Sequence, residues 1–119
     1  MATRKKSKPA PTLKPPRIYE ATLAPGPSGV VYQGSELDPV AAVAARQAGQ
    51  DVVICGDDVD ANRRRAQVIE AAVGPYVRDD PHRKAGPHAL PQDHQQTRLP
   101  EGHAIYETGS KDRKSRKPP

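Results

Sequence analysis

The chain has 119 residues, 14 of them proline, with no Phe or Trp and a single cysteine. A chain of this length holds one domain of modest size, whose core must be built from Val, Ile, Leu and Ala. One cysteine cannot form an intramolecular disulfide, which excludes a disulfide-stapled scaffold.

The net charge of +5 is concentrated at the two ends of the chain. Residues 1–17 hold six basic and no acidic side chains, 109–119 hold five basic and one acidic, and 18–108 carry a net charge of −5. Because proline-rich runs of like charge resist folding, we expect a disordered basic arm over 1–17, a folded domain over 18–108 and a disordered basic tail over 109–119. Such tails serve either solubility or contact with nucleic-acid phosphates.

The basic start of the chain is not followed by an apolar segment, and no 18 apolar residues run together. This pattern predicts neither a signal peptide nor a membrane span. We therefore expect a soluble cytoplasmic protein.

The first predicted elements form a hairpin. Residues 17–24 (RIYEATLA) alternate as a strand does, 25–29 (PGPSG) are typical of a turn, and 30–34 (VVYQG) indicate a second short strand. Antiparallel pairing of the two strands follows from the short connection.

A helix is predicted next, with Asp38 as N-cap, Pro39 in its first turn and Gly49 just past its end. The apolar run 51–55 (DVVIC) is short enough to be a fully buried strand.

A second helix should begin at Asp58 or Asp60 and end at about Val73, before Gly74 and Pro75. Its apolar positions fall at helical spacing, which leaves most of the arginines at 63–65 in solvent. These positions are Val59, Ala66, Ile69 and Val73.

A long loop should span about 76–102 and lead to a last strand over 103–108 (HAIYET). Strands interleaved with helices favour a layered sheet. The predicted fold is a small single domain of the α+β or α/β class, with about four strands and two helices packed on the sheet.

All four histidines fall in or directly after this loop, at His82, His88, His94 and His103. Their spacing matches no standard zinc pattern, and Cys55 lies in a distant predicted strand. We therefore expect neither a metal site nor any other cofactor.

Imidazoles suit acid–base catalysis because they titrate near neutral pH. Two of them could remove the proton of a ribose 2′-hydroxyl and protonate the leaving oxygen, giving a cyclic phosphate and a free 5′ end. The four histidines are the candidate catalytic residues. The candidate substrate-binding residues are three cations that could hold the phosphate and one aromatic donor or stacking surface: Arg83, Lys84, Arg98 and Tyr106.

The segment GPHALPQDHQQTRLPEGHAIYE, within residues 81–107, resembles the C-terminal nuclease modules of bacterial polymorphic toxins. That resemblance implies a compact α/β or α+β nuclease domain whose catalytic His, Arg and Lys lie in late loops and strands.

A second resemblance, to toprim domains, covers residues 30–66. Asp58 and Asp60 would be the magnesium-binding Asp-x-Asp pair, but Gln33 stands where the family has a glutamate, which removes a hard oxygen ligand. Capping of the second helix explains the same carboxylates without a ligand, so we favour that interpretation.

The sequence thus favours a metal-independent ribonuclease-like activity. The alternative is a non-catalytic module that binds nucleic acid or protein through its basic tails. The expected partner is nucleic acid, RNA before DNA, and not a membrane; whether a cognate inhibitor or other partner protein exists is left open.

Overall fold

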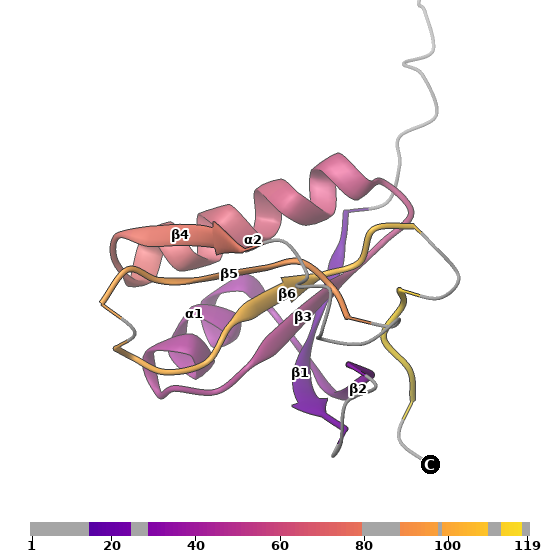
Figure 1. Cartoon of the computed structure of the whole chain (residues 1–119), viewed down its shortest axis with the longest axis horizontal. Helices are drawn as coiled ribbons and strands as arrows, with labels where there is room; N and C mark the ends of the chain where they lie inside the picture. Colours follow the sequence, from indigo (N-terminus) through magenta and orange to yellow (C-terminus); the bar gives the residue numbers. More distant parts are fainter. Residues whose placement is uncertain (1–14, 25–28, 80–88, 98, 110–112, 118–119) are drawn as a thin grey trace, which may run out of the picture.

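The computed structural model describes residues 15–24, 29–79, 89–97, 99–109 and 113–117. They form a six-stranded sheet with two helices packed on one face (Figure 1). In chain order the elements are β1 (Arg17–Leu23), β2 (Val31–Leu37), α1 (Pro39–Gln47), β3 (Val52–Cys55), α2 (Val59–Val73), β4 (Tyr76–Asp79), β5 (Gln92–Gln95) and β6 (Ala104–Tyr106).

The strand order across the sheet is β2-β1-β3-β6-β5-β4. Strands β3 and β6 pair in parallel, and the other four neighbouring pairs are antiparallel. The sheet is therefore mixed, and the α+β class and the two packed helices agree with expectation.

Both helices begin where the sequence predicts. Asp38 accepts a hydrogen bond from the Ala41 amide at 2.7 Å, and Asp58 accepts one from the Ala61 amide at 3.2 Å. Each carboxylate satisfies an amide that has no partner within the first helical turn. Gly49 follows α1 with φ +85°, a conformation that favours glycine.

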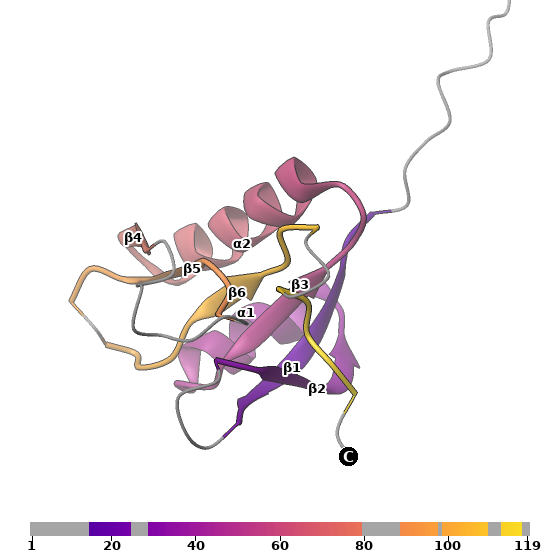
Figure 2. The same cartoon turned by 45° about the vertical axis from the view of Figure 1, so that its right-hand side comes forward.

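Strand β3 lies at the centre of the core and is buried on both faces. Val52 and Ile54 pack against the helices, whereas Val53 faces the opposite side of the sheet. The helix-side cluster consists of Ile18, Ala42, Val52, Ile54, Ala66, Ile69, Ala104 and Tyr106. The helix-free face has a smaller cluster of Val31, Val53, Leu90 and Ile105; Figures 1 and 2 show this face in front, with the helices behind it.

The sheet has six strands rather than about four, because part of the expected loop 76–102 is strand. Residues Tyr76–Asp79 and Gln92–Gln95 pair as antiparallel β4 and β5. The sequence QDHQ of β5 has almost no intrinsic preference for strand, so its conformation comes from pairing with β6 and β4.

The described C-terminal residues are attached to the sheet. Residues 113–117, predicted to belong to a disordered tail, run beside β2, where Arg116 forms a parallel bridge with Tyr32. At the other end, β1 begins at Arg17, the last residue of the predicted arm; residues 1–14 lie outside the described residues.

Neither helix in the described part of the chain combines the length and apolar character needed to cross a bilayer.

Candidate active site

Two of the four histidines meet on the sheet. The ring centroids of His94 and His103 lie 6.0 Å apart, with the ring planes at 89°. Both rings line a cavity of about 180 Å³, together with Glu101 and Gly102.

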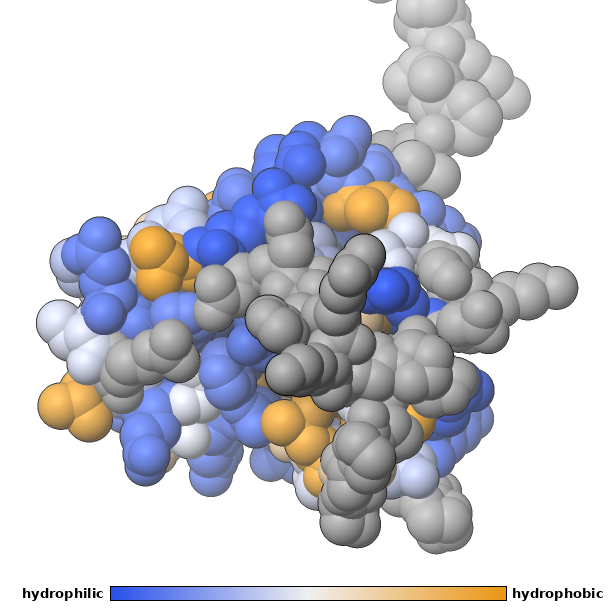
Figure 3. All heavy atoms as spheres, viewed as in Figure 1, coloured by the Kyte–Doolittle hydropathy of each residue, from blue (hydrophilic) through white to orange (hydrophobic). Residues whose placement is uncertain are grey.

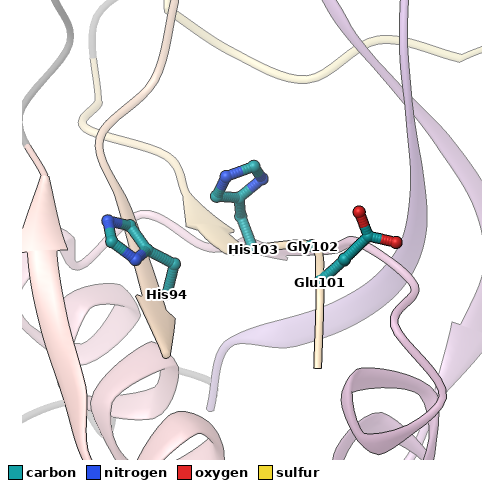
Figure 4. A pocket seen from close by; sticks show the side chains of 4 residues that line it. All are labelled: His94, Glu101, Gly102 and His103. Atoms are coloured by element: carbon teal, nitrogen blue, oxygen red, sulfur yellow. The ribbon is translucent and has the colours of Figure 1, made fainter. Parts of the chain in front are cut away.

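Strand alternation places both rings on the helix-free face. The neighbours of His94 in β5, Asp93 and Gln95, point toward the helix side, where Gln95 bonds to Glu70 of α2. His103 directly precedes Ala104, which belongs to the helix-side cluster. In Figure 4 His103 lies between His94 and Glu101.

Each imidazole is oriented by an acceptor at Nδ1. In His94, which is 4% exposed, Nδ1 lies 3.0 Å from the Gln95 carbonyl oxygen. A carbonyl oxygen can only accept, so this contact places the proton of a neutral ring on Nδ1. In His103, Nδ1 lies 3.2 Å from Asp51 Oδ1.

Asp51 was not among the predicted site residues. The same carboxylate oxygen also accepts from the His103 backbone amide at 2.8 Å, so it fixes both the ring and the chain. What places Asp51 beside His103 is the parallel pairing of β3 with β6, in which Val52 is opposite Ala104. Residues that directly precede two parallel, in-register strands are neighbours, but the sequence does not reveal which strands pair.

A buried ion pair lies beneath the two histidine segments. Arg46 of α1 donates from Nε and Nη2 to the two carboxylate oxygens of Glu70 of α2, at 2.8 and 2.9 Å, and both side chains are fully buried. Arg46 also donates to the Glu101 and Gly102 carbonyls at 2.6 and 3.0 Å. The backbone just before His103 is therefore held from below.

The segment of His94 is attached to the same pair. Gln95 donates from Nε2 to the Glu70 backbone carbonyl at 3.0 Å and to Glu70 Oε1 at 3.2 Å. One ion pair thus bonds to the neighbours of both imidazoles, and relative motion of the two rings would break charge-assisted hydrogen bonds.

Gly102 fits this crowded position because it has no side chain. Its φ is +93°, and a Cβ atom there would lie 2.7 Å from Arg46 Nη1 and 2.9 Å from the Gly49 carbonyl oxygen. A larger residue would have to displace the guanidinium or the loop.

Asp93, the neighbour of His94, is fully buried on the opposite face of β5. Neither of its carboxylate oxygens has a hydrogen-bond partner among the described residues. Burial, together with the nearby Glu70 carboxylate, raises the pKa of Asp93 to about 6. This residue was also missed, because nothing in the sequence marks it as buried.

The remaining candidates do not join the described site. His82, His88, Arg83, Lys84 and Arg98 lie outside the described residues. The assignment of Tyr106 as a substrate-binding residue is wrong: it is 2% exposed and packs in the helix-side cluster. In the alternating strand β6 its side chain points away from the face that carries the histidines.

The acidic residues after β3 serve the second helix. Asp58 is its N-cap, and Asp60 pairs with Arg63 at 3.1 Å. Gln33, which stands where toprim domains have a glutamate, donates to Ser115 Oγ at 2.7 Å. Within the described ranges, no three His, Cys, Asp or Glu side chains are grouped so that they could hold a metal ion.

Comparisons with protein-family models, curated proteins and solved structures each found no match.

Proposed function

We propose that the protein cleaves RNA without a metal ion, with His94 and His103 as the base and the acid. The observation that carries this proposal is the 6.0 Å separation of two oriented imidazoles beside one cavity. Acid–base cleavage of a phosphodiester needs two such groups near one phosphate, one to accept a proton and one to donate it.

The partners of the two Nδ1 atoms suggest which ring is the base and which is the acid. With its Nδ1 proton directed to the Gln95 carbonyl, neutral His94 has its lone pair on Nε2 and suits the base. Nδ1 of His103 can donate to the Asp51 carboxylate, which orients the ring and leaves Nε2 to donate the proton as the acid.

The reaction follows from these roles. His94 takes the proton of the ribose 2′-hydroxyl, whose oxygen attacks the adjacent phosphorus. The bond from phosphorus to the 5′-oxygen breaks, and His103 gives its proton to that oxygen. The products are a 2′,3′-cyclic phosphate and a free 5′-hydroxyl, and no electrons are exchanged with any other group.

The resemblance of residues 81–107 to toxin nuclease modules implies the same chemistry. Hydrophilic residues dominate the described surface seen in Figure 3, and its hydrophobic residues appear as separate spots. Such a surface suits a charged ligand.

A fluorogenic single-stranded RNA incubated with the protein in EDTA tests the proposal. We expect cleavage, a 10²- to 10⁴-fold loss in His94→Ala and in His103→Ala, and none of that loss in Gln96→Ala, an exposed neighbour of β5. A DNA oligonucleotide of the same sequence should stay intact because it lacks the 2′-hydroxyl. Intact RNA at micromolar protein would refute the activity.

The alternative function, a non-catalytic module that binds through its basic ends, is favoured by the exposed cations of residues 113–117. RNA that binds but stays intact would support it.

A further inference from the structure

Residues 113–117 (RKSRK), here named the cationic segment, carry four basic and no acidic side chains and are attached to the sheet. The Arg116 amide donates to the Val31 carbonyl at 2.8 Å, and the Gln33 amide donates to the Arg116 carbonyl at 2.8 Å. The backbone of the segment thus extends the pairing of β2.

Ser115 is the side chain that anchors the segment. Its amide and its hydroxyl donate to Glu107 Oε2, at 2.9 and 2.5 Å, and its hydroxyl oxygen accepts from Gln33. Glu107 is buried, whereas Lys114, Arg116 and Lys117 are exposed. The backbone and the Ser115 hydroxyl therefore hold the segment in place together with Arg113, and three of its four basic side chains are exposed.

The cationic segment lies on the same face of the sheet as the histidines. Ser115 Oγ is 3.0 Å from the sulfur of Cys55, which packs against the helix-free cluster. Arg113 donates to the Ala89 carbonyl at 2.9 Å, three residues before β5, the strand of His94. Figure 2 shows the segment, in yellow, in front of the sheet and away from the helices.

We propose that the cationic segment is a fixed phosphate-binding strip that holds single-stranded RNA on the histidine face. The identity of the ligand rests on the proposed function. Cations that track a backbone are the usual electrostatic element of single-strand binding, and each phosphate they neutralise adds to the salt dependence. Since folding has already ordered the segment, binding loses less chain entropy than it would with a free tail.

The test measures binding of a 2′-O-methyl RNA oligonucleotide, which cannot be cleaved, by fluorescence anisotropy from 50 to 300 mM salt. For Lys114→Gln/Lys117→Gln, the slope of log K against log salt should fall by about 0.7 for each cation removed. The matched control is Arg63→Gln/Arg64→Gln on α2, which removes the same charge from the helix side and should leave the slope unchanged. Equal slopes in the two variants would overturn the proposal.

A second variant tests whether attachment of the cationic segment to the sheet contributes to oligonucleotide binding. Ser115→Ala keeps every charge but loses the hydroxyl anchor, so we expect several-fold weaker oligonucleotide binding and faster trypsin cleavage after Lys114. Unchanged affinity together with unchanged proteolysis would refute the anchored strip.

The ribonuclease proposal and the phosphate-binding strip can be refuted independently of each other. Wild-type protein that binds the oligonucleotide through the cationic segment but leaves RNA intact refutes the ribonuclease proposal and keeps the strip. Protein that cleaves RNA with the same salt dependence in all variants refutes the strip alone. Binding of polyglutamate in place of the oligonucleotide would also refute the strip, because it would indicate an acidic protein partner.

Discussion

Arg46 and Glu70 form a fully buried bidentate ion pair between α1 and α2. The same two residues hydrogen-bond to the segments next to both site histidines. Arg46 holds the Glu101 and Gly102 carbonyls, and Glu70 holds Gln95. The pair therefore has a positional effect in addition to its effect on stability, and the two can be measured separately.

Replacing Arg46 with Met should lower the free energy of unfolding by about 3–5 kcal/mol, because it leaves Glu70 buried without its counter-charge. Urea denaturation measures this loss. Val40→Ala, an 80% exposed position on the same helix, should stay within about 0.5 kcal/mol of the wild type.

The double variant Arg46→Met/Glu70→Leu should recover much of that stability, since an apolar pair can replace a buried ion pair of similar volume. Cleavage should not recover, because the Glu101 and Gly102 carbonyls still lack the Arg46 guanidinium and Gln95 keeps only its bond to the Glu70 backbone carbonyl. A double variant with restored stability and wild-type turnover would show that the pair does not position the histidines.

Gly102→Ala should destabilise the fold by about 1–3 kcal/mol, because it combines an unfavourable φ with a close contact to Arg46. It should also reduce cleavage by displacing the backbone of His103. Gly109→Ala is the control for the backbone conformation: its φ is +84° and a Cβ atom there would lie 3.2 Å from Val59 Cγ2. Thermal denaturation should therefore show a smaller penalty, and turnover at a temperature where both variants are folded should be kept. Equal turnover in the two variants would contradict the predicted role of Gly102.

The local signals in the sequence predicted much of the fold. The cap Asp38, a second helix beginning at Asp58 or Asp60, the hairpin and the buried strand predicted over 51–55 depend on neighbouring residues. All are confirmed, with the cap of the second helix at Asp58 and the strand over Val52–Cys55. Strand β5 could not be predicted because QDHQ becomes a strand only between two partners.

The candidate site was predicted only in part, for the same reason. His94 and His103 were in the candidate pool, but their convergence and their partner Asp51 depend on which strands pair. Tyr106 was proposed as a hydrogen-bond donor or stacking surface, but residues three apart in an alternating strand face opposite sides, so Tyr106 packs away from His103.

Asp93 should make stability depend on pH. Its pKa rises from 3.8 to about 6 on folding, so the folded state binds the proton more tightly, and stability is lost as the pH rises from about 4 to about 6. The nearby charges of Arg78 and His94 offset part of this effect. The expected loss is on the order of 2–3 kcal/mol.

Asp93→Asn keeps the shape of the protonated acid and removes the titration. Relative to the wild type, its free energy of unfolding should be higher at pH 8 and nearly equal at pH 4. A constant difference between the two proteins across this range would contradict the assignment.

Cys55 should be unreactive in the folded protein. Burial raises the pKa of its thiol to about 12, so little thiolate is present at pH 8. Iodoacetamide should modify the native protein far more slowly than the urea-unfolded protein, as mass spectrometry can follow. Equal rates would show that the thiol is exposed.

The chemistry of the cleaved ends tests the central claim most directly. After wild-type protein has acted on RNA in EDTA, mass spectrometry should find 2′,3′-cyclic phosphates and 5′-hydroxyls, and Asp51→Asn should form the same ends more slowly because His103 loses its carboxylate. Ends that carry 5′-phosphates, or cleavage that survives in a His94→Ala/His103→Ala variant, would contradict catalysis by the two imidazoles.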